Sequence, residues 1–275
     1  MLKQRIITAV ILAAVFFTAL FALPPAYFAA LTLVALMSAV YEWAKLAGLQ
    51  AAASLGAAGG ALLLGGALLL AGGFDPARGF PEAPVLALCG AAAVFWIAVA
   101  PLWLYRGWST RHPAGVTLLG AIAVLALWMA MVQLQARSPW LLLAVMMVVW
   151  IADTAAYFAG RKFGRRKLAP TISPGKSWEG VYGGLLGVFA YAVLLLLLSP
   201  LAAHATLSRP LVAAFALVLA TVSVVGDLFE SWLKRQAGVK DSGTALPGHG
   251  GVLDRIDALL PALPLATLFI ALLSY

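Results

Sequence analysis

Long apolar stretches are the feature that most constrains how this chain can fold. About nine of them, each roughly 20 residues long, can be traced through the sequence. An α-helix rises about 1.5 Å per residue, so such a stretch can cross the roughly 30 Å of hydrocarbon in a bilayer. We therefore expect an all-α integral membrane protein with about nine transmembrane helices, near residues 5–22, 25–44, 52–72, 84–104, 115–135, 139–159, 180–199, 210–232 and 254–274.

The first stretch also permits a second interpretation, because Lys3 and Arg5 precede it as basic residues precede the core of a secretory signal peptide. The apolar part, residues 6–23, is longer than the roughly 7–15 residues typical of a signal core. We therefore expect a retained first helix, with a cleaved signal as the alternative.

Basic residues follow a pattern that fixes the expected orientation. Of the 18 Lys and Arg residues, all but Arg78, Arg137 and Arg209 lie in the N-terminal segment or in every second connection. Cytoplasmic loops of membrane proteins are enriched in Lys and Arg. This predicts a cytoplasmic N-terminus and an outside C-terminus, in a multi-pass protein of the bacterial inner (cytoplasmic) membrane. The same bias explains the net charge of +8 without a nucleic-acid partner.

Helix packing must hold such a chain together. Cys89 is the only cysteine, which excludes a disulfide within the chain and disfavours a thiolate zinc site. Two glycine pairs have the four-residue spacing that lets helices approach closely in lipid, Gly56 with Gly60 and Gly183 with Gly187. We expect a close helix contact at each pair.

Polar residues that topology alone does not explain gather in the second half of the chain. We therefore divide the chain into residues 1–135, N-terminal transmembrane helices without a recognisable motif, and residues 136–275, which carry the catalytic site. Asp153 lies inside an apolar helix, where a carboxylate costs at least about 2.5 kcal/mol. It should face a water-filled site, or, as the alternative, a hydrogen-bonding neighbour helix.

The cytoplasmic connection after this helix contains the sequence SPGKS. It is not a phosphate-binding P-loop, because Pro170 stands where the first glycine is needed and no strand precedes it. A turn of small residues that carries Lys176, Ser173 and Ser177 is nevertheless suited to phosphate oxygens. The cations of residues 161–167 have a competing explanation, anchoring at anionic lipid headgroups.

The eighth apolar stretch carries a polar stripe near its cytoplasmic end. Asp227, Ser231 and Lys234 follow a helical spacing, and Glu230 lies beside them. Such a stripe faces protein or water. Lys234 and Arg235 could also extend to the membrane interface, but the two carboxylates have no such explanation.

The next connection adds a glycine-rich loop and two more carboxylates. The loop PGHGG can bring backbone amides close to an anion, and its histidine, His249, suits a hydrogen-bonding role in a turn. Asp254 and Asp257 share one face where the last helix begins, and a helix cap explains only Asp254. With Asp227, these carboxylates and the neighbouring cations are what a magnesium-bound polyphosphate requires.

At this point the sequence resembles a known family. The segment SWLKRQAGVKDSGTALPGHGGVLDRID, residues 231–257, is similar to the signature of the phosphatidate cytidylyltransferases, also called CDP-diacylglycerol synthases. The segment DTAAYFAGRKFGRRKLAPTISPGKSWEG resembles the family's preceding conserved segment. The resemblance implies a magnesium-dependent nucleotidyltransferase of phospholipid biosynthesis, which converts CTP and phosphatidate into CDP-diacylglycerol and pyrophosphate. It also implies a second cation and membrane lipids as partners, and it leaves a homodimer open.

The resemblance also implies roles for individual residues. The catalytic set is Asp227, Asp254, Asp257 and Lys234, and the metal ligands are Asp227, Asp254 and Asp257. Carried over by position, Ser231, Lys234, Arg235 and Lys240 would contact phosphates. The full set that we expect to bind the phosphates of CTP or phosphatidate, from the sequence and the resemblance together, is Lys176, Ser173, Ser177, Ser231, Arg235, Lys240, Asp241, His249 and Asp153. No strong general base is needed, because a phosphate monoester with a second pKa of about 6 is largely ionised at neutral pH.

Two rival functions remain open at the level of the sequence. A transporter would place polar residues near the bilayer midplane in several helices, whereas Asp153 and Asp227 lie near cytoplasmic helix ends. A CDP-alcohol phosphatidyltransferase would carry a motif that opens with Asp-Gly, and this chain contains no Asp-Gly pair.

Overall fold

The computed structural model describes residues 2–109, 112–198 and 209–272, with the backbone alone for residues 2–5. Apart from two short strands and one π-helical turn (η1), its regular elements are α-helices. They are α1 Leu2–Ala22, α2 Pro25–Leu46, α3 Ala51–Ala71, α4 Glu82–Val94, η1 Phe95–Val99, α5 Ala100–Arg106, α6 Pro113–Arg137, α7 Pro139–Phe163, β1 Lys167–Ala169, β2 Ser173–Ser177, α8 Trp178–Leu198, α9 Arg209–Gln236, α10 Leu253–Ile256 and α11 Leu259–Leu272.

The helical class expected from the sequence is confirmed. Within the described residues, seven helices are long and apolar enough to cross a membrane, with α4, η1 and α5 counted as one. Two further apolar segments, Ile6–Ala22 and Leu259–Leu272, are shorter. The chain is therefore a multi-pass membrane protein by the length and composition of its helices, and the count of nine spans stays a prediction.

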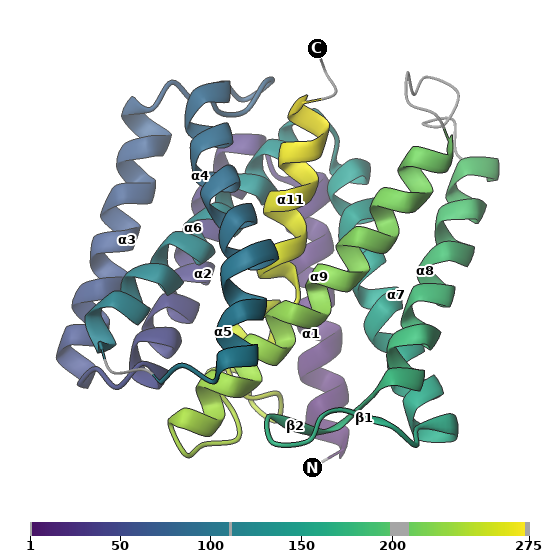
Figure 1. Ribbon diagram of the computed structural model, residues 1–275. Helices are drawn as coiled ribbons and strands as arrows, with labels where there is room; N and C mark the ends of the chain where they lie inside the picture. The colour runs from purple at the N-terminus through teal and green to yellow at the C-terminus, as the bar shows by residue number, and fades with distance from the viewer. Residues whose placement is uncertain (1, 110–111, 199–208, 273–275) are drawn as a thin grey trace.

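The elements that carry the polar segments gather at one end of the helical bundle. Figure 1 shows the β1–β2 hairpin, the C-terminal end of α9 and the N-terminus at this end, and the C-terminus at the other. The connection between α3 and α4, which contains Arg78, lies at the opposite end from the hairpin. The arrangement agrees with the alternation of basic connections, except that Arg111 lies outside the described residues.

Prolines shape several helices in this bundle. Helices α2, α6 and α7 each begin at a proline, whose missing N–H costs nothing in the first turn. Pro101, in contrast, is the second residue after η1 and cannot donate to the preceding turn. The N–H of Ala100 bonds the carbonyl oxygen of Phe95, five residues back, so the helix continues through one wider turn.

The two glycine pairs have different outcomes. A Cβ at Gly187 would lie 2.8 Å from the Cβ of Ala155, and one at Gly183 would lie still closer to the Cβ of Ala159, so this pair lets α8 pack against α7 as predicted. A Cβ at Gly56 or Gly60 would meet nothing within 4 Å. The expected close contact at that pair is therefore wrong for the described part of the chain.

An aromatic cluster holds the polar end of α9 against the N-terminal half. Phe229 is buried, and its ring centroid lies 5.4–5.9 Å from those of five neighbouring rings. The neighbours are Trp43 of α2, Phe95 and Trp96 of η1, Trp103 of α5 and Trp232 of α9. Ring pairs at this separation add to the free energy of burial, so α9 is fixed beside the site.

The last helix differs from the prediction of one continuous segment over 254–274. The short α10 ends at Ile256, and α11 begins only at Leu259, two residues before Pro261. A Cβ at Gly226 of α9 would lie 2.7 Å from Cδ of Pro261 and would also collide with the carbonyl oxygen of Asp257. Gly226 therefore lets the break between α10 and α11 pack against α9, beside Asp227.

Candidate active site

A pocket of about 560 Å³ lies among α7, β2, the start of α8, α9 and α10. The residues that line it lie in segments up to about 100 positions apart in the sequence, and they include many of the predicted site residues. The predicted residues that line it are Asp153, Ser173, Lys176, Ser177, Asp227, Asp254 and Asp257. We call it the carboxylate pocket.

Lys176 and Asp227 form an ion pair inside this pocket. The sequence SPGKS forms strand β2 of an antiparallel hairpin with β1, and not the predicted turn. This hairpin brings Nζ of Lys176 to 2.5 Å from Oδ2 of Asp227, and the side chains are 24% and 29% exposed. Because both remain partly open to solvent, a ligand can reach either group.

Two residues, Ser177 and Glu179, join the hairpin to the start of α8. The buried Oγ of Ser177 accepts a hydrogen bond from the N–H of Gly180 at 3.2 Å, in the first turn of α8. The carboxylate of Glu179, which the sequence analysis did not single out, accepts bonds from the N–H groups of Arg165 and Arg166. Ser177 therefore has a structural role at the helix start, and its predicted contact with phosphate stays a prediction.

Asp257 lies in the break before α11, outside the membrane-crossing helices. One of its oxygens, Oδ1, accepts a hydrogen bond from the N–H of Ala258 at 2.9 Å. Burial and the nearby charge of Asp227 raise the pKa of Asp257 to about 8. The pocket therefore holds Asp153, Asp227 and Asp257 as a group of mutually repelling carboxylates beside Lys176.

Asp254 has very different surroundings, since protein donors reach both of its oxygens. Nζ of Lys234 lies 2.7 Å from Oδ1, and that lysine also pairs with Glu230 at 2.5 Å. Oδ2 accepts bonds from the N–H groups of Ser242 at 2.9 Å and Gly251 at 2.8 Å, and it lies 3.0 Å from Oγ of Ser242, whose single proton it shares with a second carboxylate, that of Glu42. Burial alone raises the pKa of Asp254, but these hydrogen bonds outweigh it and lower the pKa to about 2.

Glu42 of α2 belongs to the same network, although the sequence analysis overlooked it. Its buried carboxylate accepts hydrogen bonds from Oγ of Ser242 at 2.9 Å and from the N–H groups of Val252 and Leu253 at 3.0 and 2.8 Å. A signal existed, because Glu42, like Asp153, is a carboxylate inside an apolar helix.

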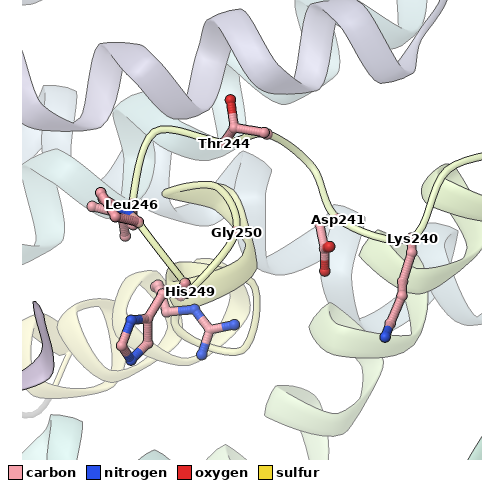
Figure 2. Close-up of a pocket in the computed structure, with 10 residues that line it drawn as sticks. Lys240, Asp241, Thr244, Leu246, His249 and Gly250 are labelled. Atoms are coloured by element: carbon pink, nitrogen blue, oxygen red, sulfur yellow. The ribbon is translucent and has the colours of Figure 1, made fainter. Parts of the chain in front are cut away.

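A second pocket, of about 620 Å³, lies over the glycine-rich loop. Figure 2 shows Lys240 and Asp241 on the segment that leads into this loop, residues 242–253, and His249 on the returning arm, with Thr244 between them. Arg255 lines both this loop pocket and the carboxylate pocket. The predicted phosphate-binding residues are thus divided between two adjoining spaces.

Three predicted residues of α9 line neither of these two pockets among the described side chains. Ser231 donates a hydrogen bond to Oδ1 of Asp227 at 3.3 Å. Nε of Arg235 donates to the carbonyl oxygen of Ile172 at 3.2 Å, which ties α9 to the hairpin. Lys234 is held by its two carboxylates. Direct substrate contacts of these three stay predictions.

The donor set can be tested against the expected magnesium ion. In the part of the chain that the structure describes, no three His, Cys, Asp or Glu side chains are arranged to hold a metal ion alone. Magnesium, however, is usually bound by one or two carboxylates together with water and substrate phosphates. Asp227 and Asp257 fit that mode, whereas Asp254 already serves Lys234, Ser242 and Gly251.

Comparison with known proteins gives a consistent result. The model of the cytidylyltransferase family matches residues 3–273. A phosphatidate cytidylyltransferase of Pseudomonas aeruginosa is 41% identical over 274 residues, covering 96% of this chain and 95% of the relative. The phosphatidate cytidylyltransferase of Haemophilus influenzae is 39% identical over 290 residues, covering 98% of each chain. That of Thermotoga maritima is 47% identical over 133 residues, covering 48% of this chain and 49% of the relative.

Proposed function

The chain belongs to the cytidylyltransferase family, and we propose that it is the enzyme that converts CTP and phosphatidate into CDP-diacylglycerol and pyrophosphate. Similarity over nearly the full length to phosphatidate cytidylyltransferases carries this conclusion. The carboxylate pocket supports it, because Lys176, Arg161 and Arg255 offer cations to phosphates within a space large enough for a nucleotide.

The reaction needs alignment and charge neutralisation more than acid–base chemistry. A phosphate oxygen of phosphatidate attacks the α-phosphorus of CTP, and the bond to the bridging oxygen of the β-phosphate breaks, releasing pyrophosphate. The attacking phosphate is already ionised near neutral pH. The protein would therefore act by holding both substrates in line and by placing cations, Lys176 and Arg255 among them, against the charge of the phosphates.

Magnesium dependence is part of the proposal. Asp227 and Asp257 are the best candidates to hold the ion. Asp254 is the third predicted ligand, but both of its carboxylate oxygens already accept hydrogen bonds from protein donors. Bound there, magnesium would neutralise and orient the phosphates. A second cation and a homodimer remain further predictions from the family resemblance.

Membrane orientation completes the proposal: nine spans, with the carboxylate pocket facing the cytoplasm of a bacterial inner membrane, where CTP is present. In a Cys89→Ala background, a cysteine at Ala237 should be labelled only by a reagent added to the cytoplasmic side. A matched cysteine at Ala77, in the α3–α4 connection, should be labelled only from outside. Labelling of both from one side would contradict this topology.

The activity itself is tested with purified protein. Labelled CTP, phosphatidate and magnesium chloride should give labelled CDP-diacylglycerol and pyrophosphate in equal amounts, and omission of phosphatidate should stop both. Failure to form CDP-lipid across several detergents and in lipid vesicles would overturn the proposed function.

A further inference from the structure

Glu42 is buried among groups that belong to the other half of the chain. It lies in α2, is 4% exposed, and has no ion-pair partner within 4.0 Å among the described side chains. Its hydrogen-bond donors come instead from residues 200 or more positions away, Ser242, Val252 and Leu253. A carboxylate buried this deeply needs hydrogen bonds to offset its lost hydration, and the loop supplies them.

These donors mark the two ends of one loop. Ser242 stands where the glycine-rich loop begins, and Val252 and Leu253 stand where it returns to α10. Asp254 joins the same ends, through Ser242 on one side and Gly251 on the other. The loop that carries His249 is therefore closed at its base by two carboxylates, one from each half of the chain.

Glycines are required where this closure is tightest. A Cβ at Gly243 would lie 2.7 Å from Oε1 of Glu42, and one at Gly251 would collide with both Oε2 of Glu42 and Oγ of Ser242. Gly250 has a φ of +83°, and its Cβ would lie 2.6 Å from Oδ2 of Asp254. The close approach of the two carboxylates thus explains why Gly243, Gly250 and Gly251 carry no side chain.

We propose that Glu42 is a positioning residue for the cytidylyl transfer: it closes the base of the loop 242–253 and so fixes Asp254 and Arg255 against the carboxylate pocket. The two N–H groups that Glu42 holds directly precede these residues. Arg255 lines both pockets, so a shift of this backbone would move a cation that faces the substrates. The activity readout for this role rests on the proposed function, whereas the closure of the loop does not.

The test compares Glu42→Gln with the unmodified protein. Glutamine keeps the shape but has one acceptor oxygen, so its NH₂ group faces a backbone donor and leaves it unpaired. We expect kcat to fall by about 100-fold, as a displacement of about 1 Å can cause, with the KM values for CTP and phosphatidate changed by less than about threefold. Amide hydrogen exchange at Val252 and Leu253 should become at least about tenfold faster.

A matched control is Ser54→Ala. Ser54 is also a buried polar residue of the N-terminal half, but its Oγ partners in the described structure are the carbonyl oxygens of Leu49 and Gln50, just before its own helix, α3. We expect wild-type turnover and unchanged exchange at Val252 and Leu253. Ser242→Ala provides a milder second variant if Glu42→Gln does not accumulate, with an expected loss in kcat of about tenfold.

The outcomes separate the two proposals. If the unmodified protein forms no CDP-lipid, the proposed function fails, and the exchange measurement alone decides whether Glu42 closes the loop. If the unmodified protein is active, a wild-type kcat in folded Glu42→Gln would overturn the positioning role. A uniform rise of exchange through all helices, in step with the activity loss, would also overturn it, since that pattern indicates general destabilisation.

Discussion

Asp227 and Asp254 line the same pocket, but the regions that hold them differ. Asp227 projects from α9 with a side chain 29% exposed, and its partners are Lys176 and Ser231. Asp254 lies at the base of the glycine-rich loop with a side chain 5% exposed and receives bonds from Lys234, Ser242 and Gly251. The first region leaves its carboxylate accessible to a ligand, whereas the second uses its carboxylate to hold the loop.

This contrast teaches that a carboxylate in a membrane protein needs its partners identified before its role is assigned. Hydration lost on burial can be replaced by a substrate-bound cation or by fixed protein donors. The two replacements predict opposite consequences for mutation. Loss of a ligand-facing carboxylate should reduce catalysis in an intact fold, and loss of a carboxylate that bonds the protein should first loosen the segment that it holds.

The largest expected effect is that of Asp227→Asn. The change keeps the shape of the side chain and removes the charge that faces the pocket, so turnover should fall by about 10³-fold. The thermal midpoint of the purified protein should stay within about 4 °C of wild type, because a partly exposed ion pair contributes little stability. Turnover assays and a thermal melt on one preparation measure both.

Two comparisons sharpen this result. Asp75→Asn, in the α3–α4 connection at the other end of the bundle, removes a carboxylate that only bonds its own turn and should leave turnover unchanged. The double variant Asp227→Asn, Asp254→Asn should be scarcely less active than Asp227→Asn alone if both serve one metal ion. Near-wild-type turnover in Asp227→Asn would show that Asp227 is not the carboxylate that serves the substrates.

The second effect, on stability, is expected for Asp254→Asn. Asparagine cannot balance the charge of Lys234, whose remaining partner is Glu230, and its NH₂ group would face donors that now bond Oδ2. Breaking a buried charged network costs about 3–5 kcal/mol, or roughly 10 °C in thermal midpoint. The melt of Asp254→Asn should therefore lie well below that of Asp227→Asn, and equal midpoints would contradict the contrast.

Sequence alone predicted the helical framework and much of the carboxylate pocket. Hydropathy identified the helices because a segment that crosses lipid must be long and apolar. The polar stripe of α9 indicated Asp227 because a charge that faces lipid is costly, so this carboxylate must face protein or water. The sequence could not show that Ser177 bonds the first turn of α8, or that protein donors already reach both oxygens of Asp254. Hydrogen bonds depend on which segments meet, and that is a tertiary property.

Glu42 illustrates the same limit from the other side. The sequence shows a carboxylate inside an apolar helix, where its lost hydration is unfavourable. Its partners are 200 or more positions away in the chain, so no local pattern connects it with the loop. The failure at Gly56 and Gly60 has a related cause, since small residues permit a helix contact without specifying a partner. A pair of small residues only permits a helix contact, whereas a buried charge requires a partner, so the buried charge is the stronger prediction.

The smallest effect is expected for Lys176→Ala, which probes the accessible region without removing a carboxylate. Lys176 is partly exposed and faces Asp227, so its loss removes one cation from the phosphates and leaves the hairpin hydrogen bonds in place. We expect the KM for CTP to rise about tenfold, the scale of one charged hydrogen bond, while the amount of folded protein is unchanged. Lys167→Ala is the matched control, because Lys167 lies in the partner strand, is exposed and does not line the carboxylate pocket. If Lys167→Ala raised the KM as much as Lys176→Ala, the effect would reflect the overall charge of the hairpin, and the direct contact between Lys176 and a phosphate would be wrong.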